Sequence, residues 1–192
     1  TDLVEWQKNK TSGPLNDVGV IVPNYKHKEK YVMFHGQTDI KISFSDDLES
    51  WENTHTVLRP STKYFDRYPL EIAQVMMLPD GILVLYYVKE EYREGTFYSV
   101  GAALFDPKDP SKLMWRRTSP VCSLKQEDHS GQLYPMGIVY FKEKLLMYFG
   151  VKGKYVFVVH YGEFDKIFDD LPGHIHPRLE KHHKNPIMTP VL

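Results

Sequence analysis

The sequence has very little cysteine and no long hydrophobic segment. Cys122 is the only cysteine among 192 residues, so neither an intramolecular disulfide nor a zinc site with several cysteine ligands can form. No apolar run is long enough to span a bilayer. Lysine and arginine are dispersed and the formal net charge is -1, so no basic stripe suggests binding to nucleic acid or to an anionic membrane. We therefore expect a globular protein that binds neither of these partners.

Targeting and metal-binding motifs are missing as well. His174, His176, His182 and His183 lie in the last part of the chain, without HExxH spacing and without an accompanying set of carboxylates. A solvated tail is therefore favoured over a metal site, and we expect neither a metal ion nor a cofactor. The sequence begins with Thr1 and shows no signal peptide. Together with the single cysteine, this is compatible with a cytoplasmic location.

Aromatic residues, in contrast, are abundant. They make up 14% of the sequence and include 13 tyrosines. Because aromatic side chains are favoured in β-strands, we assign most of them to a β-core. Sugars stack on aromatic faces, so a carbohydrate-binding surface is the second interpretation of the same composition.

One short motif occurs three times along the chain. Residues 39–51, DIKISFSDDLESW, begin with apolar residues at every second position and continue with an acidic pair that can bend the chain through Asx-type hydrogen bonds. Residues 1–6 and 109–115 repeat the Asp-Leu-x-x-Trp pattern in full or in part. Such self-similarity is typical of β-propellers and solenoids. The tryptophan that ends each copy is expected to be a packing residue, because a repeated position indicates a repeated structural role.

The expected strands group into repeated antiparallel meanders of the size of propeller blades. The first unit has strands at residues 17–23, 31–35, 39–45 and 53–59, the second at 71–78, 82–88, 96–105 and 114–120, and the third at 133–141, 144–150 and 155–161, to which residues 185–191 could add an outer strand. The charged segment 89–95 is expected to be a loop. Residues 164–171, FDKIFDDL, have apolar residues at helical spacing and predict a short helix.

The chain is therefore predicted to be all-β, a β-propeller of about three four-stranded antiparallel blades with a short C-terminal helix. Residues 1–192 form a single, partial propeller domain. The expected divisions are the end of a preceding blade at 1–10, blades at 11–60, 61–122 and 123–163, and the helix and tail at 164–192. Three blades do not close a ring, so the open blade edges are expected to meet earlier blades or, in a homo-oligomer, another copy.

Four stretches, in this order, resemble a known family. They are TDLVEWQK at residues 1–8, YVMFHGQTDIKISFSDDLESW at 31–51, VGAALFDPKDP at 100–110 and PMGIVYFKEKLLMYFG at 135–150. Together they resemble the five-bladed β-propeller glycosidases, most closely glycoside hydrolase family 130 and more distantly family 43. The resemblance covers nearly the whole chain. It implies that the chain forms the C-terminal three blades of such a propeller and acts on a β-mannoside or a related oligosaccharide.

Two acids stand at the starts of expected inner strands, about one repeat apart: Asp17 and Glu71. Both should face the central funnel, where cleavage of a glycosidic bond needs carboxyl groups flanking that bond. The resemblance to family 43 implies that Glu71 is the general acid, with a raised pKa, and that Asp17 tunes it. It also implies that a further catalytic Asp belongs to the earlier blades. The second interpretation is structural, with Asp17 capping a loop and Glu71 on a rim.

Six further residues are candidates for binding the sugar because they lie along the expected funnel. They are His35, Tyr68, Gln74, Asp128, His129 and Tyr134. Asp128 and His129 precede the last inner strand and could hydrogen-bond sugar hydroxyls, although a polar loop between blades is the favoured interpretation of this pair. An oligosaccharide is thus the expected partner.

Three departures from family 130 bear on the reaction type. His35 is followed by Gly36 where the family has an arginine that helps to hold phosphate, residues 86–88 read Tyr-Tyr-Val in place of Tyr-His-Gly, and residues 148–153 lack an Asp. A phosphate dianion needs cationic or imidazole donors, so hydrolysis is favoured over phosphorolysis. Two other functions stay open, a non-catalytic carbohydrate-binding propeller and a structural module that assembles with another chain.

Overall fold

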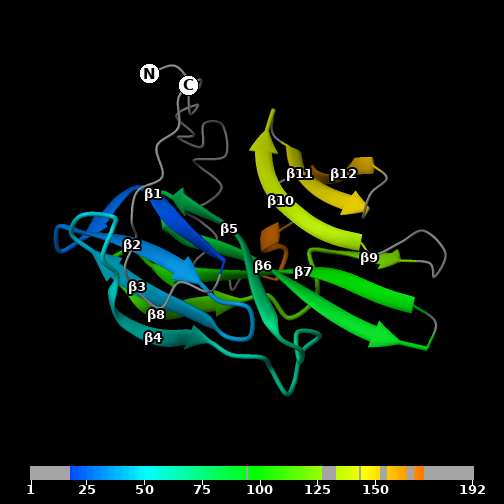
Figure 1. Cartoon of the computed structure of the whole chain (residues 1–192), viewed down its shortest axis with the longest axis horizontal. Coiled ribbons are helices and arrows are strands. Elements are labelled where there is room, and N and C mark those ends of the chain that lie inside the picture. The colour runs from blue at the N-terminus through cyan, green and yellow to red at the C-terminus, as the bar shows by residue number, and fades with distance from the viewer. Residues whose placement is uncertain are drawn as a thin grey trace.

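Three antiparallel sheets follow one another along the chain in the computed structural model (Figure 1). The structure describes residues 18–93, 95–126, 133–142, 144–151, 155–163 and 167–170. The first sheet contains β1 (Gly19–His27), β2 (Lys30–His35), β3 (Ile40–Ser45) and β4 (Glu52–Leu58). The middle sheet contains β5 (Leu70–Leu78), β6 (Gly81–Tyr92), β7 (Gly95–Asp106) and β8 (Asp109–Arg116), with β9 (Cys122–Gln126) paired to β7. The third contains β10 (Leu133–Phe141), β11 (Lys144–Val151) and β12 (Tyr155–Glu163).

The predicted all-β character and the antiparallel meanders are confirmed. Each strand expected between residues 17 and 161 overlaps a strand of the structure. The possible outer strand at 185–191 and the blade end at 1–10 lie outside the described residues. The boundary expected at residue 122 falls at the start of β9, which belongs to the middle sheet because it pairs with β7.

The acidic turn after β3 forms as its sequence predicts. The Asp47 carboxylate accepts hydrogen bonds from the backbone N–H groups of Glu49 and Ser50, both at 2.8 Å. The Ser45 hydroxyl accepts another from the N–H of Leu48, whose φ of 67° is left-handed. The hydrogen bonds from Ser50 and Glu49 lower the pKa of Asp47 because they stabilise its charged form. The turn is thus a local Asx structure that the side chains of the motif build themselves.

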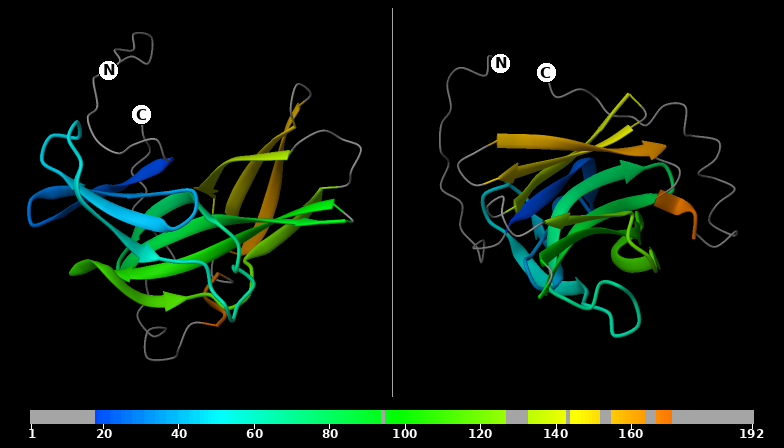
Figure 2. Two further views of the ribbon diagram at one scale, coloured as in Figure 1. Left: turned by 60° about the horizontal axis from the view of Figure 1, so that its bottom comes forward. Right: turned by 90° about the vertical axis from the view of Figure 1, so that its right-hand side faces the viewer.

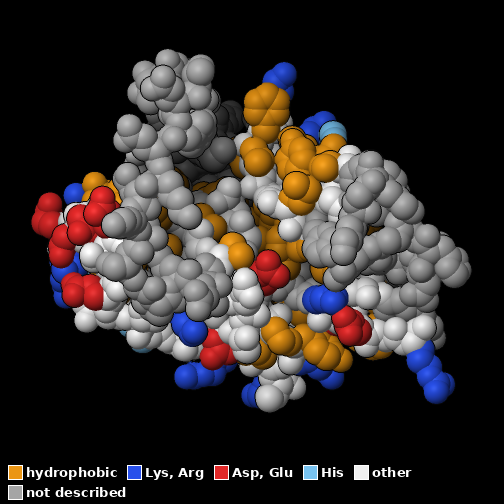
Figure 3. Space-filling model, viewed as in Figure 1, with side chains coloured by type: hydrophobic (Ala, Val, Ile, Leu, Met, Phe, Trp, Pro, Cys, Tyr) orange, Lys and Arg blue, Asp and Glu red, His pale blue; other side chains and the backbone are white. Residues whose placement is uncertain are grey.

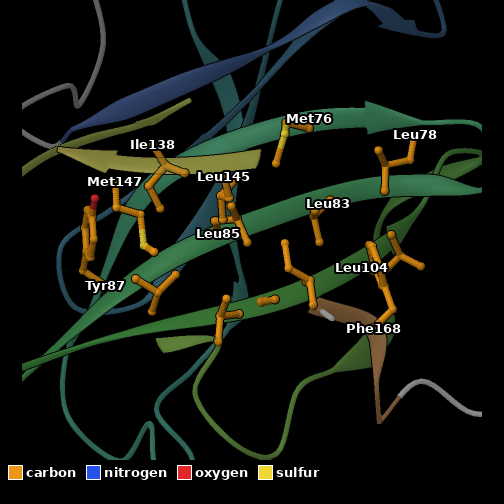
Figure 4. Close-up of a cluster of buried hydrophobic side chains, with 14 of the residues drawn as sticks. Met76, Leu78, Leu83, Leu85, Tyr87, Leu104, Ile138, Leu145, Met147 and Phe168 are labelled. Carbon is orange, nitrogen blue, oxygen red and sulfur yellow. The ribbon is translucent and has the colours of Figure 1, made fainter. Parts of the chain in front are cut away.

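The middle sheet is buried on both faces because its central strands are apolar along their length. The even-numbered residues of 82–88 join a core with the first sheet, and the odd-numbered residues of 83–87 join a core with the third. This is the two-residue period of a β-strand. Figure 4 shows the second core, where side chains of the middle sheet meet Ile138, Leu145 and Met147.

Two of the motif tryptophans lie among the described residues. Trp51 and Trp115 are buried, which confirms their expected role. The ring of Trp115 lies 5.8 Å from that of Phe168, so the segment that follows β12 returns to cover the middle sheet. Asp170 fixes this return, since its carboxylate accepts hydrogen bonds from the N–H and the hydroxyl of Thr118, both at 2.9 Å.

Two local predictions are wrong. Of the helix expected at 164–171, the structure describes 167–170, which form a short 3₁₀ turn and a tight turn. The apolar residues Ile167 and Phe168 are adjacent and both buried against the middle sheet, so tertiary packing replaces a helical face. The expected loop at 89–95 is also wrong, because Lys89 to Tyr92 continue β6 and pair with β7.

The third sheet crosses over the middle sheet, and none of the other described strands covers its opposite face (Figure 2). Exposed hydrophobic side chains gather on it, as Figure 3 shows. They are Met136, Val139, Phe141, Val156 and Val158. None of the described segments forms a helix with the length and apolar character needed to cross a bilayer.

Candidate active site

The first strands of the three sheets lie next to one another. The side-chain amide of Gln74 on β5 donates to the carbonyl of Ile138 on β10 at 2.9 Å. On its other side β5 lies against β1. All three strands carry an irregularity in their pairing with the next strand: between Ile21 and Lys26, between Ile72 and Gln74, and between Pro135 and Gly137. Bulges of this kind re-aim side chains, and they are over-represented next to active sites.

The loop between β2 and β3 joins β1 to the start of β5. The N–H of Gly36 donates to the carbonyl of Val18, and the carbonyl of Gly36 accepts from the N–H of Ile72 at 3.1 Å. The carbonyl of Thr38 accepts from the N–H of Leu70 at 2.9 Å. Two backbone hydrogen bonds therefore hold the chain on both sides of Glu71 against this loop, and a third ties the loop to Val18 before β1.

Gly36 is required by the backbone of this loop. Its φ is 126°, and a Cβ at this position would lie 2.1 Å from the carbonyl oxygen of Asp39. Only glycine adopts such a conformation without strain. Position 36, for which the resemblance implied an arginine in the family, thus has no room for a side chain in this loop.

The irregularity in β5 decides which way Glu71 points. With the pairing of Leu78 to Gly81 continued without interruption, Tyr87 would lie opposite Ile72; the shift places it opposite Glu71 instead. Directly opposed side chains lie on the same face of a sheet, and Tyr87 belongs to the core with the third sheet. A single extra residue therefore turns Glu71 from the side of the first sheet to the side of the third.

The surroundings of Glu71 favour its neutral form. The side chain is half-buried, and this burial raises the pKa of the Glu71 carboxyl. Its neighbour Tyr87 is buried as well, and its hydroxyl donates to the carbonyl of Gly137 at 3.4 Å. Burial first, and then the nearby Cys122 and Glu71, raise the pKa of Tyr87, so this phenol stays neutral. The result is a carboxyl group that holds its proton to higher pH than a solvent-exposed glutamate does.

The structure uses two of the expected sugar-binding residues for internal contacts. His35 is 1% exposed, and its Nε2 lies 2.9 Å from the Ser43 hydroxyl, which in turn lies 2.6 Å from that of Thr54. The Gln74 side chain donates its amide N–H to the carbonyl of Ile138 and accepts a hydrogen bond from the N–H of Val75 at its amide oxygen. Both side chains therefore hold strands in place.

The remaining candidates divide into described and undescribed residues. Tyr68 is partly buried against the core between the first and middle sheets, near the start of β5. Tyr134 belongs to β10, although its side chain lies outside the description. Asp17, Asp128 and His129 lie outside the described residues. Of the two proposed acids, the structure therefore places Glu71 alone.

Tyr87 was missed as a possible site residue by the sequence analysis. Counting back from the turn between β5 and β6 places Tyr87 opposite Ile72. The irregularity in β5 must be known before Tyr87 can be placed opposite Glu71. In the residues that the structure describes, no group of three or more His, Cys, Asp or Glu side chains could hold a metal ion.

Comparison with known proteins identifies the family. The model of glycoside hydrolase family 130, described as beta-1,4-mannooligosaccharide phosphorylase, matches residues 3–171. A curated relative, the 1,2-beta-oligomannan phosphorylase of Thermoanaerobacter sp., is 30% identical over 123 residues, which are 62% of this chain and 40% of the relative. The chain belongs to glycoside hydrolase family 130.

Solved structures agree with this assignment. One similar structure is 26% identical, with a TM-score of 0.60 over 74% of this chain and 48% of that one. It was reported under the statement that the GH130 family of mannoside phosphorylases contains glycoside hydrolases that target beta-1,2 mannosidic linkages in Candida mannan. Beta-1,2-mannobiose phosphorylase from Listeria innocua shares the fold at 24% identity, with a TM-score of 0.63 over 88% of this chain and 48% of that one. The chain thus spans about half the length of these structures.

Proposed function

We propose that this chain supplies Glu71 as the general acid of a glycosidase that cleaves β-mannosides. The observation that carries the proposal is the half-buried carboxyl of Glu71, whose pKa burial raises, at the place where β1, β5 and β10 meet. A general acid must hold a proton until the leaving oxygen takes it, and a raised pKa favours this protonated state. The β-mannoside substrate is inferred from the family and its named relatives.

The three sheets are, in this proposal, consecutive blades of a five-bladed propeller. Neighbouring first strands, joined by the Gly36 loop and by Gln74, support it. Asp17 is proposed to tune the acid, because the next residue, Val18, is hydrogen-bonded to the same loop that holds the start of β5. A negative charge beside Glu71 would raise its pKa further.

The group that accepts the sugar is proposed to be water. Gly36 supports hydrolysis, since its backbone leaves no room for the cationic side chain that holds phosphate. Phosphorolysis is the second candidate, because the curated relative is a phosphorylase. The relatives thus do not support the preference for hydrolysis that the sequence suggested.

The test is turnover of β-1,2- and β-1,4-linked manno-oligosaccharides, with and without inorganic phosphate. The proposal predicts release of free mannose that does not depend on phosphate, and its loss in the Glu71→Gln variant. Mannose 1-phosphate as the product would establish phosphorolysis instead. Glu49→Gln, an exposed glutamate on the turn after β3, is the matched control and should retain activity. Turnover that survives Glu71→Gln would refute the role of Glu71.

A further inference from the structure

The hairpin of β6 and β7 projects beyond the strand that carries Glu71 (Figure 1). The pairing of β5 with β6 ends where Leu70 meets Val88, but β6 continues through Tyr92, paired residue by residue with β7. On the other edge of β7, β9 pairs with residues 96–100. The projection is therefore a three-stranded ribbon, and it begins one residue from Glu71.

Aromatic rings gather on one face of this ribbon. Tyr92 and Phe97 lie edge to face, with ring centroids 5.6 Å apart and an interplanar angle of 87°. Tyr92 is 52% exposed although it lies in a paired strand. Tyr68, just before β5, is close enough to Tyr92 for its phenol to contribute to the raised pKa of Tyr92. Three aromatic side chains thus meet beside the start of β5.

A carboxylate completes the surface. The hydroxyl of Tyr92 donates to the carboxylate of Glu90 on the same face of β6. This bond first, then burial and the Tyr68 phenol, raise the pKa of Tyr92 to about 12, so the phenol stays neutral. On the opposite face of β6, Lys89 and Glu91 form an ion pair of 2.5 Å. A fixed aromatic face with a carboxylate at its edge offers an apolar surface and hydrogen-bond acceptors together.

This combination matches the two sides of a pyranose. A sugar ring presents C–H groups on its face, which pack against aromatic rings, and hydroxyl donors at its edge, which bind carboxylates. Along a strand, Tyr92 lies about 13 Å beyond Val88, the residue opposite Leu70. It also lies on the face of β6 that Val88 shares with the first sheet, whereas Glu71 faces the third sheet with Tyr87. The surface is therefore separate from the position where the bond would be cleaved at Glu71.

We infer that Tyr68, Tyr92 and Phe97, with Glu90, form a platform that binds a pyranose unit of the oligosaccharide at a distance from the cleaved bond. The inference rests on the proposed function for the identity of that oligosaccharide. It gives the ribbon a role that the sequence analysis, which expected a charged loop there, did not assign.

The test is isothermal titration calorimetry with β-1,2- and β-1,4-linked mannobiose and mannotetraose. The parent protein is the Glu71→Gln variant, because this substitution should prevent turnover during the titration. Adding Tyr92→Ala or Phe97→Ala should weaken binding of the preferred tetraose about tenfold or more, as expected for truncation of an aromatic contact. Binding of the corresponding mannobiose should change less than about twofold. Tyr92→Phe keeps the ring and should retain most of the affinity, which separates stacking from any effect on folding.

Tyr64→Ala is the matched control, since Tyr64 is an exposed tyrosine in the connection between β4 and β5 and should leave both affinities unchanged. Unchanged tetraose affinity in Tyr92→Ala and Phe97→Ala, or an equal loss in Tyr64→Ala, would overturn the platform and leave the proposed function standing. Tight binding without turnover by the wild-type protein would overturn the proposed function and leave the platform standing. Absence of binding by the parent protein would overturn both.

Discussion

Replacing Gly101 with alanine tests how closely the Tyr86 ring packs against the neighbouring strand of the middle sheet. Gly101 lies directly opposite Tyr86, and a Cβ at position 101 would come within 2.3 Å of two carbons of the Tyr86 ring. Tyr86 is fully buried, and its hydroxyl donates to Asp66 at 2.5 Å. The ring therefore has to move, and its buried hydrogen bond moves with it.

The expected cost has two parts. Overpacking of a close-packed core costs about 1–3 kcal/mol. A buried polar group that loses its partner costs about 1–3 kcal/mol more. We therefore expect the free energy of unfolding of Gly101→Ala to fall by roughly 2–6 kcal/mol, a large share of the approximately 5–15 kcal/mol available to a protein domain.

Urea denaturation followed by tryptophan fluorescence measures this change. Gly137→Ala is the control, because no heavy atom lies within 4 Å of the Cβ that it would add, and it should change stability by no more than about 1 kcal/mol. In a Tyr86→Leu background, Gly101→Ala should cost less, which a double-mutant cycle detects. Equal stability of Gly101→Ala and Gly137→Ala would refute the packing described for Tyr86.

Three further predictions concern charged groups. Burial raises the pKa of folded Glu71, so wild-type stability should fall as pH rises through that pKa. Glu71→Gln should therefore be more stable than wild type at pH 7, and this gain should vanish in acid. Urea denaturation at several pH values measures both effects. Asp47→Ala should lower the thermal midpoint more than Asp46→Ala, because the Asp46 carboxylate only pairs with Lys30 on the surface. Since the pKa of Asp47 is lowered in the folded protein, this difference between the two variants should shrink as pH falls through that pKa. Asp66→Ala should cost about 3–5 kcal/mol of unfolding free energy, since it leaves the Arg116 guanidinium without its buried partner; an effect under about 1 kcal/mol would count against that pair.

Local patterns in the sequence were sufficient to predict the strands. Alternating apolar residues in β3 and the continuous apolar run of β6 each predict a strand, and the run in β6 also predicts burial on both faces. The turn after β3 follows from Ser45 and Asp47, whose side chains bond backbone groups within a few residues. These features depend on near neighbours, and the sequence shows near neighbours directly.

Features that depend on distant pairing were not predictable in the same way. Charges at 89–93 indicated a loop, but β7 is paired on both edges in this region, and the ribbon holds these residues in strands with their polar side chains outward. The irregularity in β5 and the left-handed conformation of Gly36 likewise arise from contacts between sheets. The sequence therefore identified Glu71 as a candidate but not its orientation or its neighbour Tyr87.

The role of Glu71 as a proton donor is tested most directly by varying the leaving group. Rates of Glu71→Gln and wild type should be compared for β-mannobiose, whose sugar leaving group needs a proton, and for 2,4-dinitrophenyl β-mannoside, whose leaving group does not. The account predicts a loss of about 10²–10⁴-fold with mannobiose and a much smaller loss with the aryl mannoside, because general acid catalysis contributes a factor of this size. An unchanged rate with mannobiose, or equal losses with both substrates, would contradict it.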